Sequence, residues 1–130
     1  MAKLIVGCGY LGSRVARLWK AAGEPVWALT RSAEKAQALA GEGVSAVVAD
    51  LQNLRDLPSS LFPSEGFSTV LYSVGYDRTS QGSIEQAYAG GLKNLLGLPF
   101  FNSARGQTCR WIYISSTGVY GDAAGDFVDE

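Results

Sequence analysis

Residues 4–12 read Leu-Ile-Val-Gly-Cys-Gly-Tyr-Leu-Gly, an apolar run followed by three glycines in the spacing G-x-G-x-x-G. The apolar run is typical of a buried parallel strand. Apolar side chains then recur at helical intervals and indicate one face of a helix: Leu11, Val15, Leu18, Trp19 and Ala22. A glycine turn that joins such a strand to such a helix indicates a site for the pyrophosphate of a dinucleotide.

Each glycine of this turn has its own predicted role. Gly7 permits the tight turn, Gly9 lets a pyrophosphate approach the backbone, and Gly12 lets helix and strand pack closely. The helix N-terminus offers unpaired N–H groups and a partial positive charge to the phosphates. A glycine-rich turn without a ligand is the alternative, whereas a nucleoside-triphosphate loop would need a following Gly-Lys-Ser/Thr. The predicted cofactor-binding residues of the turn are Gly7, Cys8, Gly9, Tyr10, Leu11 and Gly12.

Strand and helix patterns alternate along the rest of the chain. Further strands are predicted at residues 26–29, 44–49, 68–74 and 110–115. Helices are predicted from the cap Ser32 to Ala40, and behind a capping box of Ser83 and Gln86, where Gly91 indicates close packing on the sheet. Residues 51–67 read as a loop with one helical turn at 53–57. We predict an α/β fold with a doubly wound parallel sheet in the strand order 3-2-1-4-5 and helices on both faces.

Composition restricts the class of protein. The chain has 130 residues, of which 47% are hydrophobic and 18% charged, with a net charge of −1. These values fit one globular domain and argue against a nucleic-acid or membrane-surface protein. The chain has no histidine, which excludes His-based triads and the usual His/Cys zinc sites, so no metal site is predicted. The two cysteines, Cys8 and Cys109, are far apart, which favours a reducing cytoplasm.

The ends of the later strands indicate which dinucleotide binds. The second strand is followed by Arg31 and Ser32 where a carboxylate would accept from the 2′-hydroxyl of NAD, and a guanidinium matches the 2′-phosphate of NADP. NADP(H) is therefore predicted over NAD(H), with a solvated Arg31 as the alternative. Asp50, with Leu51 after it, is predicted beside the adenine, although a turn or cap aspartate fits equally well. The cofactor ribose is predicted next to Ser73, Val74 and Gly75, where Gly75 could instead be an ordinary strand-to-loop glycine.

Residues 111–122 read Trp-Ile-Tyr-Ile-Ser-Ser-Thr-Gly-Val-Tyr-Gly-Asp. Together with the glycine turn, this stretch resembles the extended short-chain dehydrogenase/reductase family, the NAD-dependent epimerase/dehydratase group. The resemblance implies that residues 1–130 form the Rossmann domain that binds NAD(P), without the C-terminal substrate lobe. It also implies a small-molecule substrate such as a nucleotide sugar, with Ser116 contacting the reacting group and Ser115 beside it at the cofactor.

Two departures from the family pattern bear on activity. The family base is a tyrosine followed by lysine at the fourth position after it, and none of the six tyrosines here has that lysine. Tyr88 stands where the family often has asparagine. We therefore expect a cofactor-binding fragment of an epimerase, dehydratase or reductase that is inactive by itself; the alternative is a non-catalytic NADP(H)-sensing regulatory module. Apolar surface left bare, including Phe100, Phe101 and Trp111, predicts a homo-oligomer.

Overall fold

The computed structural model describes residues 1–54, 57–74, 89–102 and 109–114. Its centre is a sheet of five strands in the order β3-β2-β1-β4-β5, with every neighbouring pair parallel. This confirms the predicted topology, including the reversal of strand order between β1 and β4. The strands are β1 (Lys3–Val6), β2 (Val26–Thr30), β3 (Ser45–Val48), β4 (Thr69–Tyr72) and β5 (Arg110–Tyr113).

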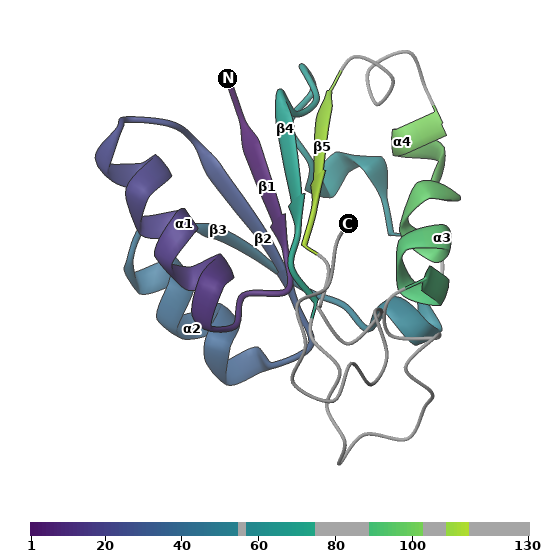
Figure 1. Cartoon of the computed structure of the whole chain (residues 1–130), viewed down its shortest axis with the longest axis horizontal. Helices are drawn as coiled ribbons and strands as arrows, with labels where there is room; N and C mark the ends of the chain where they lie inside the picture. Colours follow the sequence, from purple (N-terminus) through teal and green to yellow (C-terminus); the bar gives the residue numbers. More distant parts are fainter. Residues whose placement is uncertain (55–56, 75–88, 103–108, 115–130) are drawn as a thin grey trace, which may run out of the picture.

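Helices cover both faces of the sheet (Figure 1). Two helices, α1 (Tyr10–Ala21) and α2 (Ala33–Gly41), lie on one face. On the other face lie the shorter helices α3 (Gly91–Leu96) and α4 (Pro99–Asn102). Two 3₁₀ turns, η1 (Leu51–Asn53) and η2 (Ser59–Leu61), connect β3 to β4.

The alternation of side chains along the strands divides the core into two clusters. Leu4 and Val6 of β1 face the cluster that includes α3 and α4, whereas Ile5 faces the cluster that includes α1 and α2. All three side chains are at most 1% exposed, so β1 is buried on both faces. A strand buried in this way needs a continuous apolar run, which is why residues 4–6 carry no polar side chain.

Most predicted boundaries agree with the structure to within one or two residues. Ser32 caps α2 as predicted, since its hydroxyl oxygen accepts a hydrogen bond from the Lys35 N–H at 3.2 Å. The loop after β3 differs from the prediction: it has 3₁₀ turns at 51–53 and 59–61 instead of one turn at 53–57. Pro99 begins α4, because proline suits the first position of a helix. The predicted capping box at residues 83–86 lies outside the described residues.

The apolar face predicted for the first helix is only partly the face that packs: Val15 and Trp19 pack against the core, and Leu11 and Leu18 do not. Leu11 is 41% exposed and Leu18 is 68% exposed, whereas the residues of α1 that are buried are Gly12 and Ala16. The helix approaches the sheet so closely at Gly12 that the fully buried part of its contact face is made of small side chains. Val15 and Trp19 pack partly buried beside that contact, whereas Leu11 and Leu18 face away from it.

The predicted exposure of Phe100 and Phe101 is also wrong. Both rings are buried, at 5% and 6% exposed, and pack with Phe62 and Phe67 into one aromatic cluster. Trp111 is half-buried, with its ring 5.3 Å from that of Phe101. The exposed large apolar side chains lie elsewhere, and those on the outermost described strands and on α1 are Tyr10, Leu11, Leu18, Val48, Ile112 and Tyr113.

Gly91 packs closely on the sheet, as its sequence context predicts. A Cβ added there would lie 2.6 Å from the Tyr72 hydroxyl oxygen and 3.3 Å from Leu51 Cβ. Tyr72 is 1% exposed and stacks on Tyr113, with 5.4 Å between ring centroids. Burial raises the pKa of Tyr72 to about 12. The phenol therefore stays neutral, and it fills the space between β4 and the start of α3.

Replacing Gly91 by alanine should destabilise the fold by about 1–3 kcal/mol, because the new methyl group overlaps the Tyr72 hydroxyl. Gly41→Ala is the matched control, since no atom lies within 4 Å of its added Cβ. The free energy of unfolding in urea should fall for Gly91→Ala and not for Gly41→Ala. The penalty should shrink in a Tyr72→Phe background, and an unchanged penalty would contradict the proposed overlap.

Within the described residues, no helix has the length and apolar character required to cross a membrane.

Candidate functional site

The turn after β1 is held against the end of β4 by a contact between backbones. Gly7 has φ +86°, and a Cβ on it would lie 2.9 Å from both the Cα and the N of Val74. The Ser73 hydroxyl donates a hydrogen bond of 2.6 Å to the Gly7 carbonyl oxygen, and the Ser73 N–H donates to the Val6 carbonyl at 2.9 Å. No side chain fits between these segments, so position 7 requires glycine for both conformation and space.

The third glycine sets the distance between α1 and the strand below it. A Cβ on Gly12 would collide with the Gly7 carbonyl oxygen and would lie 3.1 Å from Ile5 Cγ2. This agrees with the packing role predicted for Gly12. The close approach brings the first turn of α1 directly above the end of β1.

The second glycine differs from the other two because no described residue fills the space beside it. A Cβ on Gly9 would lie more than 4 Å from every atom of the described residues outside its chain neighbours and its own helix backbone. Gly9 is also the N-cap of α1, and no side chain among the described residues caps this helix. Its first turn carries no acidic side chain, and the Ser13 hydroxyl donates to the Cys8 carbonyl instead of accepting from an N–H. The positive end of α1 is therefore left available to an anion.

The Cys8 side chain belongs to the core although its backbone belongs to the turn. It is 4% exposed, and burial raises the pKa of its thiol, an effect that the charge of Lys35 partly offsets. A neutral, buried thiol packs like a small apolar side chain. Any contact of residue 8 with a ligand therefore has to come from its backbone.

Arg31 and Ser32 lie at the end of β2, at the same edge of the sheet as the glycine turn. Arg31 is exposed, and none of the ion pairs between described residues involves it. The Ser32 oxygen is occupied as the cap of α2, and the Ser32 N–H donates to the Thr30 hydroxyl at 3.3 Å. The Ser32 hydroxyl hydrogen and the Arg31 guanidinium remain as donors at this corner.

Asp50 adopts the cap role that the sequence left open as an alternative. Its carboxylate accepts from the Gln52 N–H at 3.0 Å and from the Asn53 side-chain amide at 3.2 Å, which starts η1. The Leu51 side chain is buried against Gly91, and its carbonyl accepts from Asn94 at 2.7 Å. The adenine contact predicted for Asp50 and Leu51 stays a prediction. In the structure, both residues make contacts within the protein, Asp50 as a cap and Leu51 against α3.

The structure brings part of the predicted site together. The glycine turn, Ser73 and Val74 are in direct contact, and Arg31 and Asp50 follow neighbouring strands that end at the same edge of the sheet. Gly75, Ser115 and Ser116 lie outside the described residues, so their predicted roles stay predictions.

Two residues of α1 were not identified from the sequence as part of the site. The Arg14 guanidinium lies over the Tyr10 ring at 4.3 Å from its centroid, a contact that the i, i+4 spacing could have indicated. The Ser13 hydroxyl donates a hydrogen bond to the Cys8 carbonyl of the turn.

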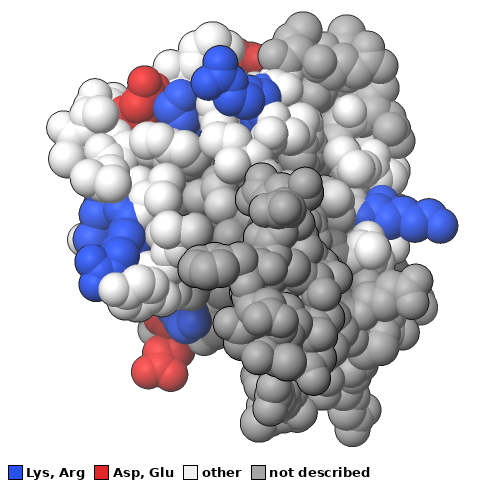
Figure 2. All heavy atoms as spheres, viewed as in Figure 1, with Lys and Arg blue, Asp and Glu red and all other residues white. Residues whose placement is uncertain are grey.

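On the face shown in Figure 2, the charged side chains of the described residues do not form one continuous patch. Lys and Arg side chains lie in separate groups on the visible face, several of them near Asp or Glu (Figure 2). Arg17 pairs with Glu42 through two hydrogen bonds of 3.2 Å. Within the described ranges, no cluster of three or more His, Cys, Asp or Glu residues could hold a metal ion.

The turn geometry and the sheet topology can be compared with known proteins. The sequence model described as the NAD dependent epimerase/dehydratase family matches residues 4–130. The chain belongs to this family. No protein of curated function matches it.

Solved structures share the fold at low sequence identity. The first is described as a putative NAD-dependent epimerase/dehydratase from Bacillus halodurans, with 24% identity and a TM-score of 0.68 over 97% of this chain and 56% of that one. A serine dehydrogenase from Escherichia coli has 19% identity and a TM-score of 0.72, over 96% of this chain and 66% of that one. A short-chain dehydrogenase/reductase superfamily protein from Agrobacterium tumefaciens, with bound NAD, has 22% identity and a TM-score of 0.64, over 93% and 34%. The chain thus spans about half the length of the first structures that it matches.

Alanine at Gly12 and alanine at Gly9 should affect stability differently. Gly12→Ala should lower the free energy of unfolding by about 1–3 kcal/mol, because its methyl group collides with the Gly7 carbonyl. Gly9→Ala should cost less, at most about 1 kcal/mol, because its methyl group meets no described atom and only the preference for glycine over alanine at the N-cap is lost. Thermal and urea unfolding of both variants against the wild type measure the difference. Equal losses would show that the space beside Gly9 is filled by protein.

Proposed function

We propose that this chain is the NADP(H)-binding part of an oxidoreductase that acts on a small molecule of the nucleotide-sugar type. One observation carries the proposal: among the described residues, no atom fills the space beside Gly9 and no side chain caps the N-terminus of α1 at the same place. A Rossmann turn in this family uses such a space for the cofactor pyrophosphate. The NAD bound to the Agrobacterium structure, a member of the same superfamily, supports the class of cofactor.

The residues at the turn fit a dinucleotide. The backbone N–H groups at the start of α1 would bind the pyrophosphate, and the absence of a side chain at Gly9 lets the phosphates approach them. The Ser73 hydroxyl keeps the Gly7 carbonyl bonded and so orients it away from an anion's approach. Bound nicotinamide would supply hydride transfer, and this chain would position it.

Arg31 is the basis for NADP(H) over NAD(H). It is an exposed guanidinium at the end of β2, without an ion pair among the described residues, and Ser32 and the start of α2 lie beside it. A 2′-phosphate would give the guanidinium a bidentate partner, whereas a ribose hydroxyl would give it one weak bond.

The remaining features of the proposal rest on the family pattern. Ser116 would bond the reacting hydroxyl or carbonyl of the substrate, and the missing Tyr-x-x-x-Lys pair leaves this chain inactive by itself. The strand β5 lies at the edge of the described sheet and exposes Ile112 on one face and Tyr113 on the other, so two copies could associate through this edge. Both Cys8 and Cys109 are free thiols, which is consistent with a reducing cytoplasm.

Calorimetric titration with NADPH tests the cofactor site. The wild type should bind NADPH, and Gly9→Ala should bind it at least about tenfold more weakly, since a Cβ occupies the space that the pyrophosphate needs. The thermal midpoint of Gly9→Ala, measured without cofactor, shows that the variant is folded. Unchanged affinity in a folded Gly9→Ala variant, or no binding of either cofactor by the wild type, would refute the proposal.

The same titration with NADPH and NADH tests Arg31. Arg31→Ala should weaken NADPH binding by roughly 10- to 100-fold, because a charge-assisted bond to phosphate is lost, and should change NADH binding little. Lys93→Ala removes an exposed charge from α3 on the opposite face of the sheet and serves as the control. Equal affinity of the wild type for the two cofactors would remove the case for NADP(H).

A further inference from the structure

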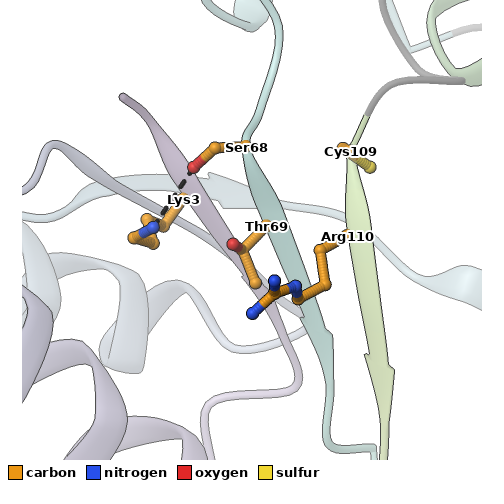
Figure 3. Close-up of a pocket in the computed structure, with 5 residues that line it drawn as sticks. All are labelled: Lys3, Ser68, Thr69, Cys109 and Arg110. Atoms are coloured by element: carbon orange, nitrogen blue, oxygen red, sulfur yellow. Dashed lines mark hydrogen bonds between the residues drawn. The ribbon is translucent and has the colours of Figure 1, made fainter.

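A hollow of about 500 Å³ lies at the opposite edge of the sheet from the glycine turn, where the strands begin. It is lined by Lys3, Ser68, Thr69, Cys109 and Arg110 (Figure 3). Lys3, Thr69 and Arg110 are the first residues of β1, β4 and β5. The four residues of β1 separate the hollow from the turn by about 13 Å, so it is not part of the cofactor site.

Strand register gathers two cations around this hollow. Lys3 pairs with Thr69, and Thr69 pairs with Arg110, so the three residues stand side by side across neighbouring strands. With strands about 4.8 Å apart, the Cα atoms of Lys3 and Arg110 are separated by about 10 Å. The Arg110 side chain extends from β5 toward Thr69 of β4, whereas the Lys3 side chain lies on the other side of β1, where its ammonium group bonds Ser68 (Figure 3).

Neither cation is neutralised by the described part of the chain. No carboxylate of a described residue lines the hollow, and the two ion pairs between described residues involve neither Lys3 nor Arg110. The N-terminal ammonium group already binds Glu24 at 3.1 Å and lowers the pKa of its carboxyl, with a smaller contribution from Lys3. The Cys109 thiol adds no negative charge, because burial raises its pKa.

Hydrogen-bond donors are also available at the hollow. Lys3 donates one hydrogen bond, of 3.2 Å, to the Ser68 hydroxyl oxygen, and its ammonium group also lies 5.7 Å from the centre of the Trp19 ring. An ammonium group has three N–H donors, so two remain beyond the bond to Ser68. The Ser68 hydroxyl itself donates to the Ala2 carbonyl at 3.2 Å, which holds it in place. The Arg110 guanidinium is exposed and offers a planar fork of donors, and the Thr69 hydroxyl lies between the two cations.

We propose that this hollow is a second anion site, which binds a phosphate group between Lys3 and Arg110. A phosphate has several acceptor oxygens and up to two negative charges, so it can bond an ammonium and a guanidinium at the same time. A carboxylate has one charge and two oxygens and would engage one of the two cations well. The proposal does not depend on the proposed cofactor function, since the two sites share no residue.

Nuclear magnetic resonance titration of the 130-residue chain with inorganic phosphate tests this site, with chloride used to hold the ionic strength constant. The amide signals of Lys3, Thr69 and Arg110 should shift and saturate at millimolar phosphate. The signals of residues 9–12 report separately on anion binding at the glycine turn. Methyl phosphate in place of inorganic phosphate shows whether a free phosphate or a phosphate monoester binds more tightly, and tighter binding of either supports the site.

Charge-removing variants supply the matched controls. Arg110→Gln and Lys3→Gln should each weaken phosphate binding at the hollow roughly tenfold, since each removes a charge-assisted bond. Lys93→Gln, which removes the same charge from exposed α3, should leave it unchanged. If one of these two variants does not fold, the other still tests the site.

Three results would overturn the proposal. The first is no shift at the hollow with millimolar phosphate. The second is an equal loss of affinity in Lys93→Gln and Arg110→Gln, which would indicate general charge attraction. The third is binding of acetate as tight as that of phosphate, which would reject a phosphate site. Addition of NADPH should leave the phosphate shifts at the hollow in place, and their loss would mean that the two ligands compete for one site.

Discussion

The arrangement of this domain depends on one close contact between three backbone segments. The turn at Gly7 touches the Val74 backbone, and the first turn of α1 rests on the Gly7 carbonyl at Gly12. No Cβ can be accommodated at positions 7 or 12, so the end of β1, the end of β4 and the start of α1 can meet only because glycine stands there. The Ser73 hydroxyl bonds the Gly7 carbonyl within this contact and satisfies an acceptor that the close packing would otherwise leave buried.

On the opposite face of the sheet, a glycine also permits close packing, but against a large side chain instead of the backbone. Gly91 gives room to the buried Tyr72 ring, and the aromatic cluster that includes Phe62 and Phe100 fills the rest of that face. The α1 face therefore approaches the sheet through small residues, and the α3 face is built on aromatic ones. This difference explains why the two faces follow different sequence patterns. Apolar periodicity describes a helix that packs through large side chains better than one that packs through glycine and alanine.

The strand order could be predicted because strands and helices alternate, and because crossovers between parallel strands are right-handed. The turn could be predicted because its three glycines stand between a strand and a helix. The buried face of α1 could not, since the pattern of Leu11 and Leu18 is strong while the real contact at Gly12 and Ala16 has almost no hydrophobic signal. The burial of Phe100 and Phe101 was missed for another reason: their partners, Phe62 and Phe67, are distant in the sequence. The cap role of Asp50 stayed one of two alternatives, because both roles need the same carboxylate at the same place.

By itself, the sequence determined the parallel sheet, the glycine turn and the edge at which a dinucleotide would bind, because these features follow from local patterns and chain order. The tertiary structure decided which side chains meet across that order. Only the packed sheet places Lys3 beside Thr69 and Arg110, three residues separated by 66 and 41 positions in the chain. Likewise, only the packed turn shows which glycine faces open space and which two face backbone. Register and close approach depend on contacts between distant segments, and no local pattern of residues records them.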